Sequence, residues 1–352
     1  MSRVHLGDVA IEHKETCKED KSMYPIVGLE HLTPEQITLQ NWDLNTENTF
    51  TKVFRKGNIL FGRRRAYLKK AAVAPFDGIC SGDITVIEAK EDKIIPELLP
   101  FVIQNDDLFD FAVGKSAGSL SPRVKWTHLQ NYEFELPDKQ KQHELAKVLW
   151  AIEDTRKSYQ QLIKRTDELV KSQFIEQFGD PICAESGIIG KDLFSLASGK
   201  ANTIANLSDE YEYECYGGNG VTGYSKDYLV KEPTIVIGRV GEYCGSVHIT
   251  SSFSWITDNA IYITSYDKKQ ICLDFLYIEC QIMDFHRFAA TVGQPKITQK
   301  PILENLYIVP SLKEQEQFVT FVHQSDKSKF ELNRALDELT ATYKQIIKDN
   351  LG

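Results

Sequence analysis

Two stretches decide the fold: NILFGRRRAY at residues 58–67 and TIVIGRVGEY at residues 234–243. A shift of 176 positions superposes Gly62 on Gly238 and Tyr67 on Tyr243, and the same shift brings SGDITVI (81–87) onto TDNAIYI (257–263). Self-similarity at a fixed separation is the sequence signature of a repeated architecture. We therefore interpret the chain as one design built twice.

A second block of matches follows in the same order. SPRVKWTHL (121–129) falls on QPKITQKPI (294–302) at a shift of 173, which also places Gln142 on Gln315, and YPIVG ending at Gly28 resembles YECYG ending at Gly217. Short apolar runs punctuated by Gly and Pro predict strands, while residues 96–113 and 273–291 have helix-length apolar patterning. We expect each copy to form a mixed α/β domain with a mainly antiparallel sheet.

Each copy then continues into a long stretch without Gly or Pro. Pro137-Asp138 and Pro310-Ser311 place a good N-cap residue just ahead of it. Apolar residues recur every seven positions, as at Leu145 and Ile152, with Val148, Leu162 and Leu169 interleaved. A helix of about 40 residues is roughly 60 Å long and cannot bury its apolar stripe on one small domain, so we expect the two helices to pair antiparallel.

The expected fold class is therefore α+β, with two repeated mixed domains alternating with two long helices that form an antiparallel coiled coil. The predicted boundaries are 1–136 for the first domain, 137–179 for the first helix, 180–309 for the second domain and 310–352 for the second helix.

Composition narrows the class of protein. No stretch approaches the ~20 consecutive apolar residues of a membrane helix, and the opening MSRVHL lacks the apolar core of a secretory signal, so we expect a cytoplasmic protein with no membrane partner. The seven cysteines never adopt a Cys-x-x-Cys spacing, which predicts neither disulfides nor a zinc site. The net charge is −9, yet residues 52–70 hold eight Lys or Arg and no Asp or Glu. Phosphate binding depends on such local charge.

The order of domain, helix, domain, helix resembles the specificity (S) subunits of type I restriction-modification systems over essentially the whole chain. The likeness is carried by Gly62 and Gly238 with the arginine that follows each, by the turns at 81–83 and 257–259, and by the pattern from Gly293 through Thr298. NYEFELPDKQKQHELAKVL and NLYIVPSLKEQEQFVTFV also resemble the family's passage from recognition domain into helix.

This resemblance implies a non-catalytic DNA-recognition subunit. Each domain would read one half of a bipartite target in double-stranded DNA, and the helices would set the gap and dock methyltransferase subunits, two per chain, with surface positions such as Lys147, Arg156 and Lys164. Restriction subunits would complete the complex. The sequence holds no Asn-Pro-Pro-Tyr, no Gly-x-Gly-x-x-Gly after a strand and no P-loop. We therefore expect no catalytic residue, metal or cofactor in this chain, and assign S-adenosylmethionine, ATP and Mg²⁺ to the partners.

Candidate DNA contacts are basic and polar residues near the repeated motifs, since base edges carry specificity and phosphates carry affinity. Candidate phosphate contacts of the first domain are Arg63, Arg64, Arg65, Lys69, Lys70, Arg123 and Lys125, and those of the second are Arg239, Lys296 and Lys300. Candidate base readers are Asn219, Tyr224 and Gln294. The alternative for each is a solvated side chain or a local ion pair.

For two pairs of equivalent residues we expect a structural role. We expect Tyr67 and Tyr243 to pack in the core or at a sheet edge, and Gly62 and Gly238 to meet a backbone need such as a close approach. The motifs differ between the copies, with Arg63-Arg64-Arg65 replaced by Arg239-Val240-Gly241. Domains that read different half-sites would differ in this way.

Two other functions compete with this interpretation. Asp83 with Glu88 and Lys90 mimics the carboxylates and lysine of a Mg²⁺-dependent nuclease, but the equivalent positions Asn259, Thr264 and Tyr266 cannot bind metal in the same way. The other is a coiled-coil scaffold that binds only proteins, against which the basic segment 52–70 argues.

Overall fold

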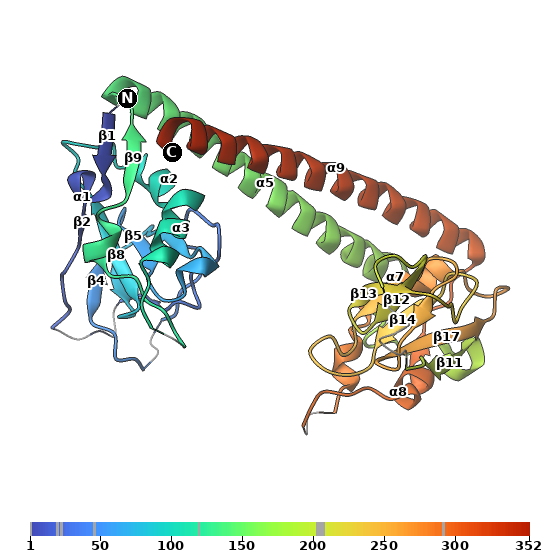
Figure 1. Cartoon of the computed structure of the whole chain (residues 1–352). Helices are drawn as coiled ribbons and strands as arrows, with labels where there is room; N and C mark the ends of the chain where they lie inside the picture. Colours follow the sequence, from blue (N-terminus) through green and yellow to red (C-terminus); the bar gives the residue numbers. More distant parts are fainter. Residues whose placement is uncertain are drawn as a thin grey trace. The chain divides into compact units, whose positions relative to one another are not determined.

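The chain folds into two compact units. The computed structural model describes residues 2–18, 21, 24–44, 47–118, 120–201, 208–290 and 293–352. The first unit comprises residues 1–161 and 332–352, and the second comprises residues 162–331 (Figure 1). Both units contain part of each of two 40-residue helices, α5 (Lys139–Phe178) and α9 (Leu312–Leu351). Among the described residues, no helix has the length and apolar composition needed to cross a membrane.

The first unit is built on three small sheets. An antiparallel four-stranded sheet has the order β2 (Ala10–Glu12), β8 (Ile84–Ala89), β5 (Ile59–Gly62), β6 (Ala71–Val73). In a three-stranded sheet, β7 (Gly78–Cys80) is parallel to β3 (Ile26–Val27) and antiparallel to β4 (Lys52–Phe54), and β1 (Ser2–His5) pairs with β9 (Glu133–Leu136). The short helices are α1 (Leu6–Val9), η1 (Ala66–Leu68), α2 (Leu99–Ile103), α3 (Asp106–Gly114) and α4 (Trp126–Leu129).

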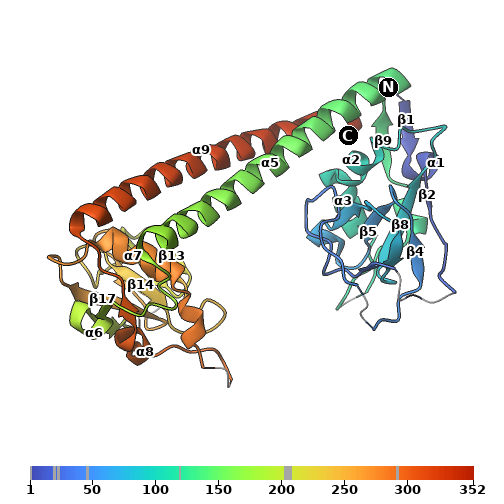
Figure 2. The ribbon, with the colours of Figure 1, turned by 180° about the vertical axis from the view of Figure 1, so that it is seen from behind.

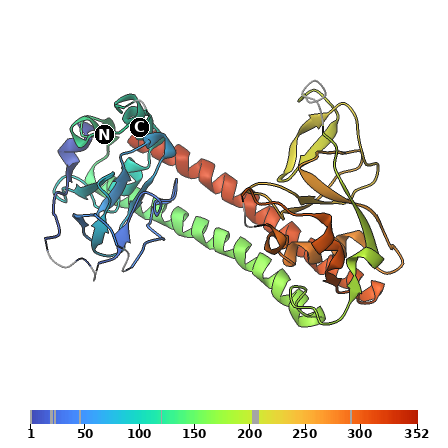
Figure 3. The ribbon, with the colours of Figure 1, turned by 90° about the horizontal axis from the view of Figure 1, so that it is seen from below.

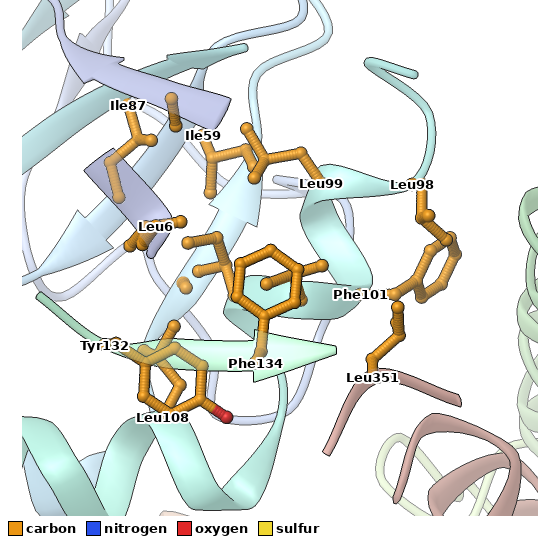
Figure 4. Packing of buried hydrophobic residues seen from close by; sticks show 14 of the residues in the cluster. Leu6, Ile59, Ile87, Leu98, Leu99, Phe101, Leu108, Tyr132, Phe134 and Leu351 are labelled. Atoms are coloured by element: carbon orange, nitrogen blue, oxygen red, sulfur yellow. The ribbon is translucent and has the colours of Figure 1, made fainter. Parts of the chain in front are cut away.

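The core of the first unit joins its sheet to both long helices. Phe61 of β5 stacks on Phe109 of α3, with ring centroids 5.5 Å apart. Phe101 of α2 packs edge to face on Tyr343 of α9, and Figure 4 shows Leu351, from the end of α9, close to Phe101. The side chain of Asn105 donates a 3.1 Å hydrogen bond to the Leu351 carbonyl. Residues far apart in the sequence therefore complete one apolar core.

The second unit repeats this plan (Figure 2). Its antiparallel four-stranded sheet has the order β11 (Phe194–Ser198), β17 (Ala260–Tyr266), β14 (Ile235–Gly238), β15 (Val247–Ile249). In the three-stranded sheet, β12 (Tyr213–Gly217) is parallel to β16 (Trp255–Ile256) and antiparallel to β13 (Gly220–Ser225), and β10 (Ile188–Ile189) pairs with β18 (Leu306–Tyr307). The helices are α6 (Gly190–Leu193), α7 (Leu273–Ile282), η3 (Phe285–Phe288) and α8 (Gln299–Glu304).

The internal repeat is confirmed at the level of strand register. Leu60 faces Ala72 and Val86 across the first sheet. Their counterparts at a shift of 176 do the same, because Val236 faces His248 and Tyr262. The match of Gly28 with Gly217 is also supported. Gly28 follows β3 and Gly217 ends β12, and each of these strands forms the parallel pair of its three-stranded sheet.

The starts of the two long helices are fixed by equivalent polar contacts. Asp138 caps α5 by accepting from the Lys141 N–H, and Ser311 and Glu314 bond each other reciprocally at the start of α9. The buried side chain of Gln142 accepts from the Ile95 N–H (3.0 Å) and donates to the Pro137 carbonyl (2.8 Å). Gln315 bonds the Cys272 N–H and the Pro310 carbonyl in the same way. Each glutamine thus ties its helix to its domain.

Helix pairing is antiparallel within each unit. In the first, the Arg156 guanidinium donates to the Thr340 hydroxyl at 3.2 Å, and in the second, Lys329 forms a 2.7 Å ion pair with Asp167. These two contacts are equivalent at a shift of 173. The boundaries at 136, 179 and 309 stay predictions, because each compact unit includes parts of both helices.

The expected heptad stripe needs a correction. Leu145 and Leu149 are buried, but Val148, Leu162 and Leu169 are about half exposed. For Val148 the reason is that the start of α5 packs on its own domain as well as on α9, which turns the side bearing Gln142, Ala146 and Leu149 inward. A heptad pattern alone does not show whether the globular domain or the other long helix covers the apolar side of a helix.

Candidate nucleic-acid interface

The first unit brings its two repeated motifs together in a short backbone ladder. The Val124 N–H donates to the Arg63 carbonyl at 3.0 Å, and the Arg65 N–H donates to the Pro122 carbonyl at 2.9 Å. Arg64 and Arg123 form the bridge between them. Arg65 has φ +53°, a left-handed conformation that ends this run and begins η1. Four candidate arginines, Arg63, Arg64, Arg65 and Arg123, therefore lie on two adjoining segments.

A single carboxylate organises this arginine cluster. Asp83 accepts from Arg123 Nε at 2.7 Å and from Arg123 Nη2 at 3.2 Å, a bidentate pair, and Arg64 Nη1 lies 3.6 Å from it. The hydrogen bonds from Arg123 lower the pKa of Asp83, so the carboxylate stays ionised. The Nε of Arg63 is buried without a hydrogen-bond partner among the described residues. One negative charge thus orients several positive ones, and the cluster keeps a net positive charge.

The second unit contains the same ladder with different side chains. The Ile297 N–H donates to the Arg239 carbonyl at 2.9 Å, and the Gly241 N–H donates to the Pro295 carbonyl at 3.0 Å. Val240 bridges Lys296, as Arg64 bridges Arg123. Gly241 has φ +80° at the place where Arg65 also adopts a positive φ. The backbone geometry is repeated while the charge is reduced.

The β12–β13 hairpin adds polar residues beside this second ladder. It stands at one end of the unit in Figure 3. A Cβ placed on Gly218 would lie 3.6 Å from the Gly238 Cα, so the turn carrying exposed Asn219 adjoins the end of β14. Gln294 and Lys296 are exposed on the ladder, and Tyr224 is exposed on β13. Arg239, Asn219, Gln294 and Lys296 are therefore neighbours in space.

Three candidates are engaged elsewhere. Lys69 forms a 2.5 Å ion pair with Asp106, and the Lys70 ammonium donates to the Leu29 carbonyl at 2.8 Å. Lys300 lies 3.8 Å from Glu304 along α8. Lys125 is exposed at the start of α4, next to Val124 of the ladder. These contacts favour a structural role for Lys69 and Lys70.

The expectation that the two equivalent tyrosines pack in the core was wrong, and their packing at a sheet edge stays a prediction. Tyr67 is 55% exposed and Tyr243 is 46% exposed, so neither is a core residue. Each follows a left-handed residue, Arg65 or Gly241, and the sharp turn directs the tyrosine outward while a small neighbour such as Ala66 is buried. Each tyrosine lies two residues after the left-handed residue of its ladder. This repetition in the sequence could have indicated that both tyrosines lie near the interface.

The suggestion that Arg156 is a surface position on the helix was also wrong. Its side chain is 11% exposed and donates to Glu153, itself buried, at 2.9 Å. The guanidinium lies over the Tyr343 ring, 5.3 Å from its centroid. Lys147 and Lys164 are exposed, as expected.

The residues of the nuclease alternative are separately engaged. Asp83 holds Arg123, Glu88 pairs with His13 at 2.7 Å, and the Lys90 ammonium donates to the Gly7 carbonyl at 2.6 Å. Among the described residues, no group of three His, Cys, Asp or Glu side chains is arranged to hold a metal ion. These contacts do not favour the nuclease alternative.

Both copies of the repeat match the model of a known protein family. Residues 3–165 and 190–340 match the family model of the type I restriction modification DNA specificity domain. The chain belongs to this family. The two matched segments of the specificity domain coincide with the two copies of the repeat, and each contains one complete four-stranded sheet.

Curated relatives carry the same family description. The type I restriction enzyme EcoprrI specificity subunit of Escherichia coli is 26% identical over 125 residues, which are 36% of this chain and 31% of that protein. The EcoDI specificity subunit of Escherichia coli is 26% identical over 161 residues, or 45% of this chain and 36% of that protein. The match therefore spans about a third of the length of these curated relatives.

Solved structures share the fold of this specificity-domain chain along its whole length. A chain from work on complex assembly and conformational transition of the type I R-M system is 18% identical with a TM-score of 0.60, covering 99% of this chain and 97% of that one. The S subunit of the type I restriction-modification system from M. genitalium is 14% identical, also with a TM-score of 0.60, covering 100% and 96%.

Proposed function

We propose that this chain is the DNA-recognition subunit of a type I restriction-modification complex, in which each globular copy reads one half of a bipartite target. The observation that carries the proposal is the ladder, which recurs in both units with the same backbone bonds and different polar side chains. A repeated frame with varied side chains suits two readers of different sequences.

The chemistry of each ladder suits a groove of DNA. Arginine can bond guanine or phosphate through two N–H groups, and Asn or Gln can bond adenine. We propose Arg63, Arg64, Arg65, Arg123 and Lys125 as contacts of the first copy. Arg239, Lys296, Gln294, Asn219 and Tyr224 are the proposed contacts of the second. The bond between Asp83 and Arg123 would hold that guanidinium in a fixed orientation before DNA binds.

The remaining functions of such a complex are proposed for partners. Methyltransferase subunits, two per chain, would dock on α5 and α9 and supply S-adenosylmethionine chemistry, while restriction subunits would supply ATP and Mg²⁺ chemistry. We propose that this chain itself catalyses no reaction and acts in the cytoplasm. We also propose that segments 1–136 and 180–309 are the two readers, and that the helices of 137–179 and 310–352 set the gap.

Methylome sequencing tests this proposal. A host that expresses the chain with its neighbouring methyltransferase should acquire adenine methylation at a bipartite motif with a fixed gap, and a host without the chain should not. In R63A/R64A, methylation should lose discrimination in one half of the motif only, and in Q294A/K296A, in the other half only. Lys93→Ala, an exposed lysine away from the ladders, is the control. Methylation at a single undivided motif would overturn the two-reader proposal.

A further inference from the structure

The two four-stranded sheets differ at one edge. In the first unit, the edge strand β6 is covered by residues 37–39 of the same chain. The Val73 N–H donates to the Ile37 carbonyl at 2.7 Å, and the Leu39 N–H donates to the Val73 carbonyl at 3.0 Å. Thr38 and Val73 thereby form a parallel bridge. The outward backbone groups of β6 are satisfied by an added strand-like segment.

The side chains of this covering segment are anchored as well. Ile37 and Leu39 are buried, and the Thr38 hydroxyl accepts from the Lys157 ammonium of α5 at 3.0 Å. The side chain of Gln104 donates to the Ala71 carbonyl at 2.5 Å, so this outward-facing carbonyl of β6 also has a hydrogen-bond donor. The edge of β6 therefore binds a segment in which two buried apolar residues flank one polar residue.

The equivalent edge of the second unit, β15, has no such cover among the described residues. Gly238 N–H bonds the Ser246 carbonyl and Thr250 N–H bonds the Thr234 carbonyl, so Val247 and Ile249 point their backbone groups away from β14. No described residue hydrogen-bonds these outward groups of Val247 and Ile249. Unpaired edges are templates for an added strand.

A groove runs along this edge. It has a volume of about 860 Å³, against about 250 Å³ for the cavity at the corresponding place in the first unit. Its walls come from β15, α7 and the parts of α5 and α9 that belong to the second unit. Apolar side chains including Val170, Ile278 and Val322 line it. The groove has an apolar lining beside an open sheet edge, which is what an added segment needs.

The charge of the groove indicates which kind of segment it can bind. Four carboxylates, Asp167, Asp274, Asp284 and Asp326, line it against two lysines, Lys171 and Lys329, and His323. Lys329 pairs with Asp167 and Asp326 at 2.7 and 2.8 Å. Asp274 and Asp284 form no ion pair with a described residue. The excess of carboxylates repels nucleic acid and attracts a cationic segment.

We propose that β15 and this groove receive an extended, positively charged segment of a partner protein, which adds a strand to the sheet. Backbone hydrogen bonds to Val247 and Ile249 would hold the segment, as the backbone of β6 holds residues 37–39. Its apolar side chains would fill the groove, and its Lys or Arg side chains would face Asp274 and Asp284. The inference does not depend on the proposed DNA recognition.

A peptide of defined sequence tests the proposal on the full chain. The probe is fluorescein-labelled KKQITLQKK, which carries the Gln36–Gln40 sequence of this chain between lysines. It should bind saturably, protect residues 247–249 from hydrogen exchange, and bind more tightly than EEQITLQEE. D274N/D284N should weaken binding about fivefold, whereas the control D209N/E185Q should not.

Ile249→Pro removes one outward N–H from the edge and tests the strand addition directly. Proline is tolerated on edge strands, so the unfolding midpoint should change little while peptide binding falls at least about tenfold. If this variant does not fold, D274N/D284N and the exchange map still decide. No binding of the lysine peptide, protection outside β15, competition by duplex DNA, or a concentration-dependent dimer that protects β15 would each overturn the proposal.

Discussion

The four-stranded and three-stranded sheets of the two units differ in how faithfully they are repeated. Three strands of the four-stranded sheets agree residue by residue in register, whereas the pairing of β11 with β17 has a bulge between Ser195 and Leu196 that the pairing of β2 with β8 lacks. In the three-stranded sheets, only the parallel pair is common. The third strand joins β7 in the first unit and β12 in the second, which are opposite edges of that pair. The central strands of the sheet that supports the ladder keep one register in both copies, and the neighbouring sheet varies in strand order.

The largest expected difference between the copies concerns one buried carboxyl group. Glu279 of α7 falls on Val102 at the shift of 177 that places Ile95 on Cys272. Burial raises the pKa of Glu279 from 4.5 to about 8, so the folded second unit holds a proton that the unfolded chain releases. Its stability contribution is complete below pH 4.5, is lost as pH rises to 8, and amounts to about 4 kcal/mol.

Urea unfolding of the second unit at pH 5 to 8, followed by hydrogen exchange of α7, measures this loss. Glu279→Gln should remove most of the slope, because it keeps an acceptor for the Ile308 N–H without a titrating group. The first unit is the internal control and should show a smaller slope, because burial also raises the pKa of its Glu153 but Arg156 and Lys157 beside it oppose the shift. An equal pH dependence in both units would contradict the assignment.

Equivalent glycines should respond unequally to alanine. A Cβ on Gly238 would overlap the carbonyl oxygen of Tyr243, which is backbone and cannot move away cheaply. A Cβ on Gly62 would lie 3.1 Å from the Lys70 carbonyl, a tight contact that a small shift relieves. We expect Gly238→Ala to destabilise by about 3 kcal/mol and Gly62→Ala by about 1 kcal/mol. Hydrogen exchange of β14 and β5 measures each, and equal losses would count against this explanation.

The two buried glutamines should respond alike. Gln142→Leu leaves the Ile95 N–H without a partner, and Gln315→Leu does the same to the Cys272 N–H. Each substitution should cost about 2 kcal/mol in its own unit. Chemical denaturation resolved by unit provides the measurement. A difference of more than about 1 kcal/mol between them would show that the helix starts are not equivalent.

The smallest effect concerns the charge that distinguishes the ladders. Asp83→Asn makes the first cluster resemble the second, which has Asn259 there. Loss of the carboxylate releases Arg64 and Arg123, so affinity for nonspecific DNA should rise about threefold and the salt slope should steepen by about one phosphate contact. Asn259→Asp should have the opposite sign. Fluorescence anisotropy of the assembled complex at several salt concentrations is the measurement, and an unchanged slope in both variants would contradict it.

Sequence reasoning was most effective where the signal was repeated along the chain. The repeat and the helix starts at Asp138 and Ser311 follow from paired patterns in the sequence, whereas the ladder that joins the two motifs of each copy became visible only in the structure. The outward Tyr67 and Tyr243 were missed because local pattern does not report side-chain direction in a sharp turn. The covering of β6 by residues 37–39 depends on long-range pairing, for which no periodicity exists. Lys69 and Lys70 were candidates by charge alone, and their partners Asp106 and Leu29 are distant in sequence.

The packing of Leu351 and Tyr343 into the first core also bears on how the protein is made. Residues 332–352 leave the ribosome about 170 residues after residue 161. At ordinary rates of synthesis this is a delay of roughly ten to thirty seconds. During that interval Phe101 and its neighbours lack the residues that cover them, and the nascent first unit exposes an apolar surface. The first half of this chain to be translated is therefore among the last parts to finish folding, and chaperones have that interval in which to bind it.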